Sequence, residues 1–210
     1  MNDKKIPEAW SKNVILADGD HIDRVAFDLI VNFERMLERR IPQVDLAHWI
    51  DCVALDGGMR PKEEQGAGSK EQETTQVILL HSKPKLENFV PGDYTQELDG
   101  KAFKDDLGEF CISCVQVEEM TTMEDLFMES MRHLYSQPEV KNLMLISDDS
   151  YLDQVLMDLH RTTIDSEKVI NVYPMQPVIN GRYNQPILGF SLMAAMGISS
   201  EEIEKKRMRF

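Results

Sequence analysis

The chain has 210 residues, of which 42% are apolar and 29% charged, and its formal net charge is -14. This composition excludes a disordered chain, a collagen-like repeat and a disulfide scaffold. No apolar run approaches the roughly 20 residues that span a bilayer, and the acidic balance argues against a protein that grips long nucleic-acid duplexes. Three cysteines, and no signal-peptide pattern in residues 1–10, predict a cytoplasmic protein without disulfides and without a membrane.

The chain opens with a strand and a long helix. Residues 14–17 form a continuous apolar run ended by acids, which is typical of a strand buried on both faces of a parallel sheet. Over residues 22–37 the apolar positions recur every three or four residues, which predicts an amphipathic helix. Asp20 is the expected N-cap of this helix.

The middle of the chain is expected to be less regular. A short helical turn is predicted over 45–49, followed by a second strand over 50–55. Residues 62–76 contain almost no apolar side chains, so we expect a mobile polar surface loop. A third strand is predicted over 77–80.

Later strands and helices alternate again. Strands are predicted over 110–117, 143–146 and 169–173, and helices over 122–135, 152–159 and 188–196, with a charged tail over 199–210. Because apolar strands alternate with helices, the expected fold is one α/β domain over residues 1–210. It should be a three-layer α/β/α sandwich around a mostly parallel, Rossmann-like sheet.

Acidic residues follow three of the predicted strands, and in one case the acid is Asp56, after the strand over 50–55. Asp18 and Asp20 end the first strand, and Asp148 and Asp149 end the strand over 143–146; His21 lies beside the first pair. Ligands of open parallel sheets bind beyond the carboxyl ends of the strands. If the first strand and the strand over 143–146 are neighbours, their carboxylates could hold Mg²⁺ or Mn²⁺, which clamps a phosphate and activates water. Aspartate also caps helices and forms turns, so a structural role is the alternative.

Two segments resemble the NYN branch of the PIN-like nucleases. In that family an Asp-Gly-x-Asn opening is followed, late in the chain, by Ser-Gly-Asp-Ser-Asp-Phe, a helix and a last strand. Here the matching segments are Asp18-Gly19-Asp20-His21 and Ser147-Asp148-Asp149-Ser150-Tyr151-Leu152. The resemblance implies a PIN-like layout and an Mg²⁺- or Mn²⁺-dependent ribonuclease that reaches RNA through a small metal-bridged site. Asp18 and Asp149 match family acids, and Asp106 or its neighbour Asp105 is the best match for the middle acid.

The chain also departs from this pattern. His21 stands in place of the family's opening Asn, Asp148 in place of its late Gly, and Tyr151 in place of its second late acid. Since a missing carboxylate weakens a metal site, a catalytically degenerate relative that acts through protein contacts is the alternative. The whole chain is also similar to an uncharacterised bacterial domain family, a similarity that implies no activity.

A second resemblance is to the haloacid-dehalogenase phosphatases. The residues that follow that family's order are Asp18 with Asp20, Ser82, Lys83 or Lys104, and Asp148 with Asp149. In such an enzyme Asp18 would be the nucleophile and Asp20 the general acid/base. However, the long helix predicted directly after Asp20 leaves no room for the loop and flap that these enzymes insert there, so this function ranks below the nuclease.

Overall fold

The computed structural model describes residues 10–59, 74–105, 108–162, 167–175 and 187–207. The main sheet contains β1 (Asn13–Asp18), β3 (Thr74–His81), β5 (Ala102–Asp105), β6 (Gly108–Gln116), β7 (Asn142–Ile146) and β8 (Val169–Val172). The helices are α1 (Gly19–Leu37), α2 (Leu46–Asp56), α3 (Met123–Ser136), α4 (Leu152–Thr162), α5 (Leu188–Ala195) and α6 (Ser200–Arg207). A two-stranded pair, β2 (Val44–Asp45) with β4 (Phe89–Val90), and a π-helix over Tyr94–Leu98 lie outside the main sheet.

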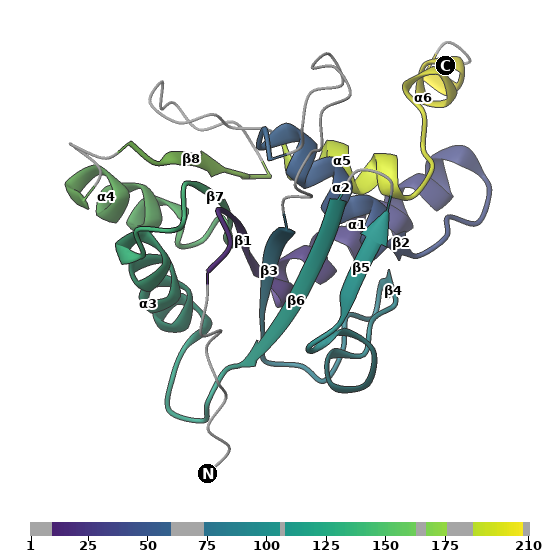
Figure 1. Cartoon of the computed structure of the whole chain (residues 1–210). Coiled ribbons are helices and arrows are strands. Elements are labelled where there is room, and N and C mark those ends of the chain that lie inside the picture. The colour runs from purple at the N-terminus through teal and green to yellow at the C-terminus, as the bar shows by residue number, and fades with distance from the viewer. Residues whose placement is uncertain (1–9, 60–73, 106–107, 163–166, 176–186, 208–210) are drawn as a thin grey trace.

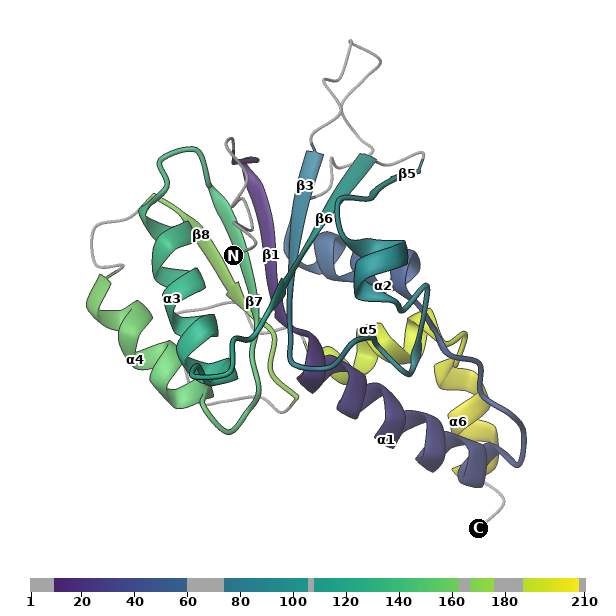
Figure 2. The ribbon, with the colours of Figure 1, turned by 90° about the horizontal axis from the view of Figure 1, so that it is seen from below.

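The main sheet has the strand order β5-β6-β3-β1-β7-β8 (Figure 1). Its neighbouring strands are parallel, except that the edge strand β5 runs antiparallel to β6. Helices α3 and α4 lie on one side of the sheet, and α1, α2 and α5 lie on the other (Figure 2). The predicted α/β sandwich with a mostly parallel sheet is confirmed.

Each face of the sheet has its own hydrophobic core. In β1, Ile15 and Ala17 point into the core beneath α1, α2 and α5, whereas Val14 and Leu16 point into the core beneath α3 and α4. Every residue of β1 is buried, because side chains of a strand alternate between two covered faces. This explains why the strand reads as a continuous apolar run.

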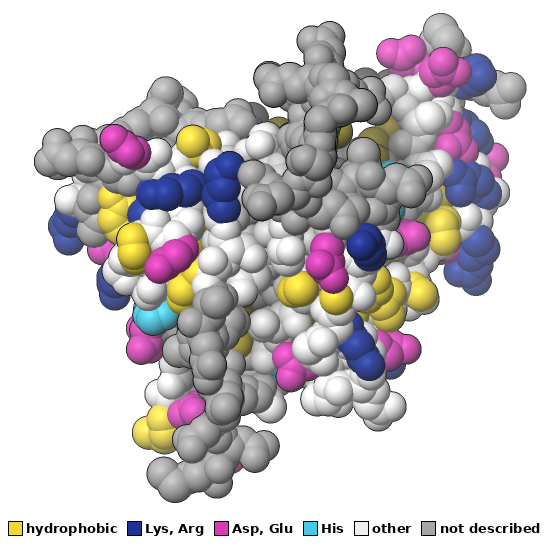
Figure 3. Space-filling model, viewed as in Figure 1, with side chains coloured by type: hydrophobic (Ala, Val, Ile, Leu, Met, Phe, Trp, Pro, Cys, Tyr) yellow, Lys and Arg dark blue, Asp and Glu magenta, His cyan; other side chains and the backbone are white. Residues whose placement is uncertain are grey.

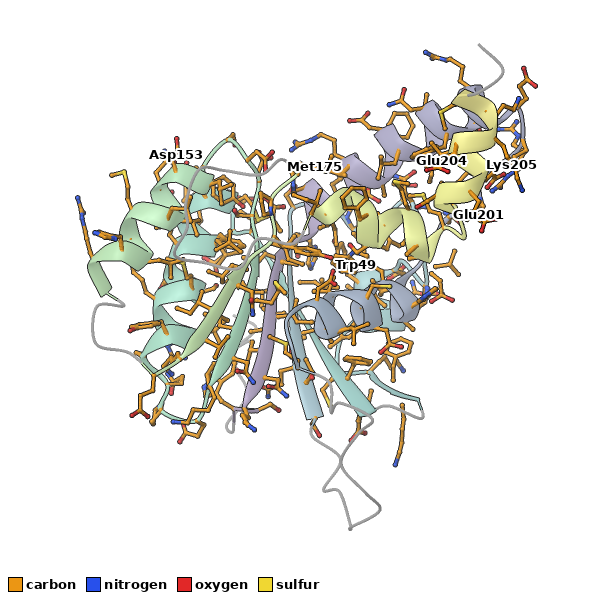
Figure 4. The ribbon with its side chains drawn as sticks, turned by 90° about the horizontal axis from the view of Figure 1, so that it is seen from above. Trp49, Asp153, Met175, Glu201, Glu204 and Lys205 are labelled. Atoms are coloured by element: carbon orange, nitrogen blue, oxygen red, sulfur yellow. The ribbon has the colours of Figure 1, made fainter. Side chains whose placement is uncertain are left out.

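The predicted second strand over 50–55 is wrong, because these residues belong to α2. A short apolar run does not distinguish a buried strand from a buried helix. Asp45 favours the helix, because it is the N-cap of α2 and its Oδ1 accepts the His48 N–H at 3.0 Å. The indole Nε1 of Trp49 then donates to Ser191 Oγ at 3.1 Å, which joins α2 to α5 (Figure 4).

The predicted cap of α1 also needs correction. The long helix is confirmed, but it begins at Gly19, and Asp18 rather than Asp20 is its N-cap. Asp18 has extended backbone angles (φ -72°, ψ 102°) and accepts the His21 N–H at 2.9 Å. An N-cap side chain accepts the backbone N–H two or three residues later, and Asp18 lies three residues before His21. The N-cap of α1 is therefore the last residue of β1.

The later strands and helices lie where the sequence predicts them. In the polar segment over 62–76, β3 already begins at Thr74, and residues 62–73 fall outside the described part of the chain. The charged tail contains α6, which is tied to the end of α1 by Arg39–Glu202 and Lys206–Glu38 ion pairs, each with an N–O distance of 2.7 Å.

Two further properties bear on the sequence predictions. All three cysteines of the chain are free thiols. Among the described residues, no helix is long and apolar enough to cross a membrane.

Candidate site at the carboxyl edge of the sheet

The carboxyl end of β1 lies where the direction of strand addition reverses. From β1 the chain adds β3 and then β6 on one side, and it later returns to add β7 and β8 on the other side. Ligands of open α/β sheets bind at such a switch point. The two acid-ended strands over 14–17 and 143–146 are neighbours, as the expected site requires, since Ala17 in β1 pairs with Ile146 in β7. Asp18, Asp148 and Asp149 therefore reach the same edge of the sheet.

Asp18 is buried and fully engaged by its own chain. Its side chain is 3% exposed; Oδ1 accepts the His21 N–H at 2.9 Å, and Oδ2 accepts the Tyr151 hydroxyl at 2.7 Å. Burial raises the pKa of Asp18, and the two hydrogen bonds only partly offset this effect. Burial and the nearby Asp18 charge likewise raise the pKa of the Tyr151 hydroxyl, which keeps it a hydrogen-bond donor.

Asp148 is held by an arginine from α1. Arg24 Nη2 donates to Asp148 Oδ2, and the Ser150 N–H donates to Oδ1 at 2.8 Å. Partial burial opposes ionisation of Asp148, but the bonds from Arg24 and Ser150 outweigh it and lower its pKa to about 2. Asp148 is therefore ionised at neutral pH, where it pairs with Arg24.

His21 lies between these two carboxylates. It is 3% exposed, and its Nδ1 lies 3.1 Å from Arg24 Nη2 and 3.6 Å from Asp148 Oδ2. Burial lowers the pKa of His21 more than Asp148 and Asp18 raise it, so the ring is neutral at pH 7. Its Nε2 is buried without a hydrogen-bond partner within the described chain.

Asp20 and Asp149 turn away from this group. The Asp20 carboxylate accepts the Ser82 N–H at 3.2 Å and also the Ser82 hydroxyl, which links α1 to the end of β3. Asp149 is exposed and accepts the Met175 N–H at 3.2 Å, at the exit of β8 (Met175 is labelled in Figure 4). Asp106 and the side chain of Asp105 lie outside the described residues.

The structure thus brings together Asp18, His21 and Asp148 from the predicted set. Sequence reasoning did not identify Arg24 and Tyr151 as their partners. The sequence did single out Tyr151 as a position of interest, because it stands where the resembled family has an acid. The indication for Arg24 was weaker: it lies three residues after His21 and therefore on the same helix face.

The described carboxyl edge does not fit Mg²⁺ or Mn²⁺. In the described ranges, no group of three or more His, Cys, Asp or Glu side chains is arranged to hold a metal ion. Both oxygens of Asp18 already accept hydrogen bonds, and so do both oxygens of Asp148, from Arg24 and from the Ser150 N–H. A hard cation needs several free oxygen ligands in one place.

A groove of about 660 Å³ opens next to this edge, between the first turns of α1 and the connection from β3 to β4. Its lining residues are Asp20, Asp23, Arg24, Phe27, Lys83, Glu87 and Asn88. The groove wall is fixed by Asp23, which accepts the Asn88 backbone N–H at 2.8 Å and its side-chain amide at 3.1 Å. The groove therefore has a rigid side formed by α1 and an adjoining side formed by the connection.

Comparison with known proteins gives one match. Neither a curated protein nor a solved structure matches the chain. A family of unknown function, DUF6621, matches residues 7–203, which is nearly the whole length. The chain belongs to this family of unknown function, DUF6621.

Proposed function

We propose that this chain is a non-catalytic binding protein, a degenerate relative of the PIN/NYN-like nucleases that acts through protein contacts. One observation carries the proposal: the carboxylates at the β1 and β7 ends are bound to donors of the chain itself. Asp18 is bound by Tyr151 and His21, and Asp148 by Arg24. They join β1, α1 and β7 in the way that a structural network does.

Electrostatics support the loss of metal chemistry. A divalent cation at Asp148 would have to displace the guanidinium of Arg24 or sit beside its positive charge. At Asp18 it would have to break the Tyr151 bond, which satisfies a buried carboxylate, and such bonds to charged groups contribute about 1.5–3 kcal/mol.

The described surface also favours protein over RNA as a partner. On the face shown in Figure 3, the described Lys and Arg side chains form short groups, with acids near them, and not one basic surface across the face. The net charge of -14 repels phosphates. Phe27, Leu55 and Phe190 are exposed on α1, α2 and α5, which cover the same face of the sheet. Large exposed apolar side chains are common in protein interfaces.

The test is metal titration by calorimetry and thermal shift, combined with a cleavage assay on single-stranded RNA. We expect Mg²⁺ and Mn²⁺ to leave the heat signal and the Tm unchanged, and the RNA to stay intact. Asp149→Asn is the matched variant, because this exposed acid lies outside the Asp18–Tyr151 and Asp148–Arg24 bonds. Saturable Mn²⁺ binding with divalent-dependent cleavage that Asp149→Asn abolishes would overturn the proposal.

The metal-dependent ribonuclease is the second candidate. The favouring observation is that Asp18 and Asp148 end neighbouring parallel strands, where family acids are expected to converge. The titration decides between the two candidates, since only the nuclease requires a bound cation.

The phosphatase is the third candidate, favoured by the Ser82–Asp20 contact between the ends of β3 and α1. It predicts turnover of a small phosphomonoester and a beryllofluoride adduct on Asp18. We expect neither, because Asp18 is buried and α1 begins at the next residue.

A further inference from the structure

The groove beside α1 has the dimensions of a ligand site. Its volume of about 660 Å³ lies within the range of about 300–1,000 Å³ that is usual for small-molecule pockets. It lies beside the switch point of the sheet, where open α/β folds bind ligands. What the groove recognises depends on which of its polar groups are still available.

Three of the charged side chains in the groove are already satisfied. Arg24 is paired with Asp148, and Glu87 is paired with Lys85 at 3.2 Å. Asp23 is buried and accepts two hydrogen bonds from Asn88. These groups shape the groove but offer little net charge to a ligand.

Two opposite charges remain available. The Asp20 carboxylate accepts hydrogen bonds only from Ser82, which is neutral, so its negative charge is not compensated within the described chain. The Lys83 ammonium forms no ion pair with any residue that the structure describes, although the side chain lines the same groove. Asp20 contacts Ser82, the residue before Lys83, and both Asp20 and Lys83 line the groove, which therefore presents a negative and a positive charge to a ligand.

An aromatic surface completes the groove. Phe27 is 54% exposed and lies one helical turn after Asp23, on the groove side of α1. An exposed phenyl ring beside two unpaired charges provides apolar contact for one part of a ligand while its charged ends are bound elsewhere.

We propose that this groove binds a small zwitterion of the amino-acid class with an apolar side chain. Asp20 binds the ammonium group, Lys83 binds the carboxylate, and Phe27 packs against the side chain. This site goes beyond the proposed function. It uses neither Asp18 nor Asp148, and it shares only Phe27 with the exposed apolar side chains named above for protein contacts.

The experiment uses three probes that share a phenyl ring: phenylalanine, 2-phenylethylamine and 3-phenylpropionate. Binding to the full chain is measured by calorimetry and by ligand-observed NMR. We expect phenylalanine to bind best and each single-charge probe to bind about tenfold more weakly, which corresponds to about 1.4 kcal/mol for one charge contact. Adenosine monophosphate is included as a fourth probe, with an aromatic base and a purely anionic end.

Two variants separate the charge contacts. Asp20→Asn should remove the advantage of phenylalanine over 3-phenylpropionate, and Lys83→Met its advantage over 2-phenylethylamine. Phe27→Ala should weaken all three phenyl probes, and Lys101→Met, outside the groove, is the control that should change nothing. Circular dichroism verifies that each variant is folded.

The proposal is overturned by any of three results: no phenyl probe binds at millimolar concentration, the preferences survive both charge variants, or adenosine monophosphate binds more tightly than phenylalanine. None of these results depends on metal, so they leave the test of the proposed function unaffected.

Discussion

The two flanks of the β1 carboxyl end use similar residues differently. On the β7 side, Asp18 is buried and bound to Tyr151, and Asp148 is paired with Arg24. On the β3 side, a groove is left open, and Lys83 within it has no carboxylate partner among the described residues. Asp18 is buried and Asp148 is paired with a cation, whereas Asp20 is partly exposed and, within the part of the chain that the structure describes, accepts hydrogen bonds only from the neutral Ser82. The comparison teaches that an acid near a strand end stays available to a ligand where the neighbouring elements neither bury it nor pair it with a positive charge.

The largest loss of stability is expected from a substitution at Gly19, where the two flanks meet. A Cβ at this position would lie 2.2 Å from the Tyr94 hydroxyl and 2.7 Å from the Leu80 carbonyl oxygen. Gly19→Ala should therefore lower the free energy of unfolding by about 3 kcal/mol, the upper range for overpacking. Gly189→Ala in α5 is the matched control, since its nearest side-chain atom would be 3.8 Å away. Equal urea midpoints for the two variants would contradict the close approach.

The second-largest loss of stability is expected on the β7 flank. Tyr151→Phe removes the hydroxyl that binds buried Asp18 and should cost about 1–3 kcal/mol of unfolding free energy in urea at pH 7. Tyr94→Phe is the control, because the Tyr94 hydroxyl is also buried but has no hydrogen-bond partner within the described residues. If both variants lose the same stability, the Asp18–Tyr151 bond contributes nothing particular to the network.

A smaller effect appears in the pH dependence. Asp148 has a folded pKa of about 2, below its ordinary value of 3.8, so it stabilises the fold above pH 3.8 and loses this contribution as the pH falls towards 2. Arg24→Met should reduce the loss of stability between pH 4 and pH 2, measured by urea unfolding at each pH. Arg132→Met, which removes an exposed pair with Asp158, provides the comparison. An unchanged acid slope in Arg24→Met would contradict the assignment.

The smallest effect is expected on the groove flank. Lys83→Met should change the unfolding free energy by less than about 0.5 kcal/mol, as is usual for a surface substitution without a partner. Together with Arg24→Met, which breaks an ion pair, this variant measures the difference between the two flanks. A Lys83→Met cost as large as that of Arg24→Met would remove the distinction.

Much of the fold is predictable from local patterns. The period of three and four over residues 22–37 and the unbroken apolar run over 14–17 each reflect the burial that the structure shows. Residues 50–55 were misleading for a physical reason: Ile50, Val53 and Ala54 form the buried face of the helix, but the half-buried Cys52 and the exposed Leu55 are apolar as well, so the helical period is weak. The cap Asp45 was the local sign that could have corrected this.

The candidate site is less predictable, because its bonds join distant residues. Asp18 and Tyr151 are 133 positions apart, and Arg24 and Asp148 are 124 apart. The sequence indicates that acids end β1 and β7, but not which donors face them once the sheet has formed. Availability of a carboxylate is a property of tertiary packing, whereas its position at a strand end is a property of the local pattern.

The order of the strands has a consequence for synthesis of the chain. β1 leaves the ribosome first, yet it lies in the middle of the sheet and pairs with β7, which begins at Asn142. Until β7 has been made, one edge of β1, all of whose residues are buried in the folded protein, has no partner strand. Parallel pairing between distant segments forms slowly and leaves such edges open to association. The nascent chain is therefore expected to need chaperone protection until β7 emerges.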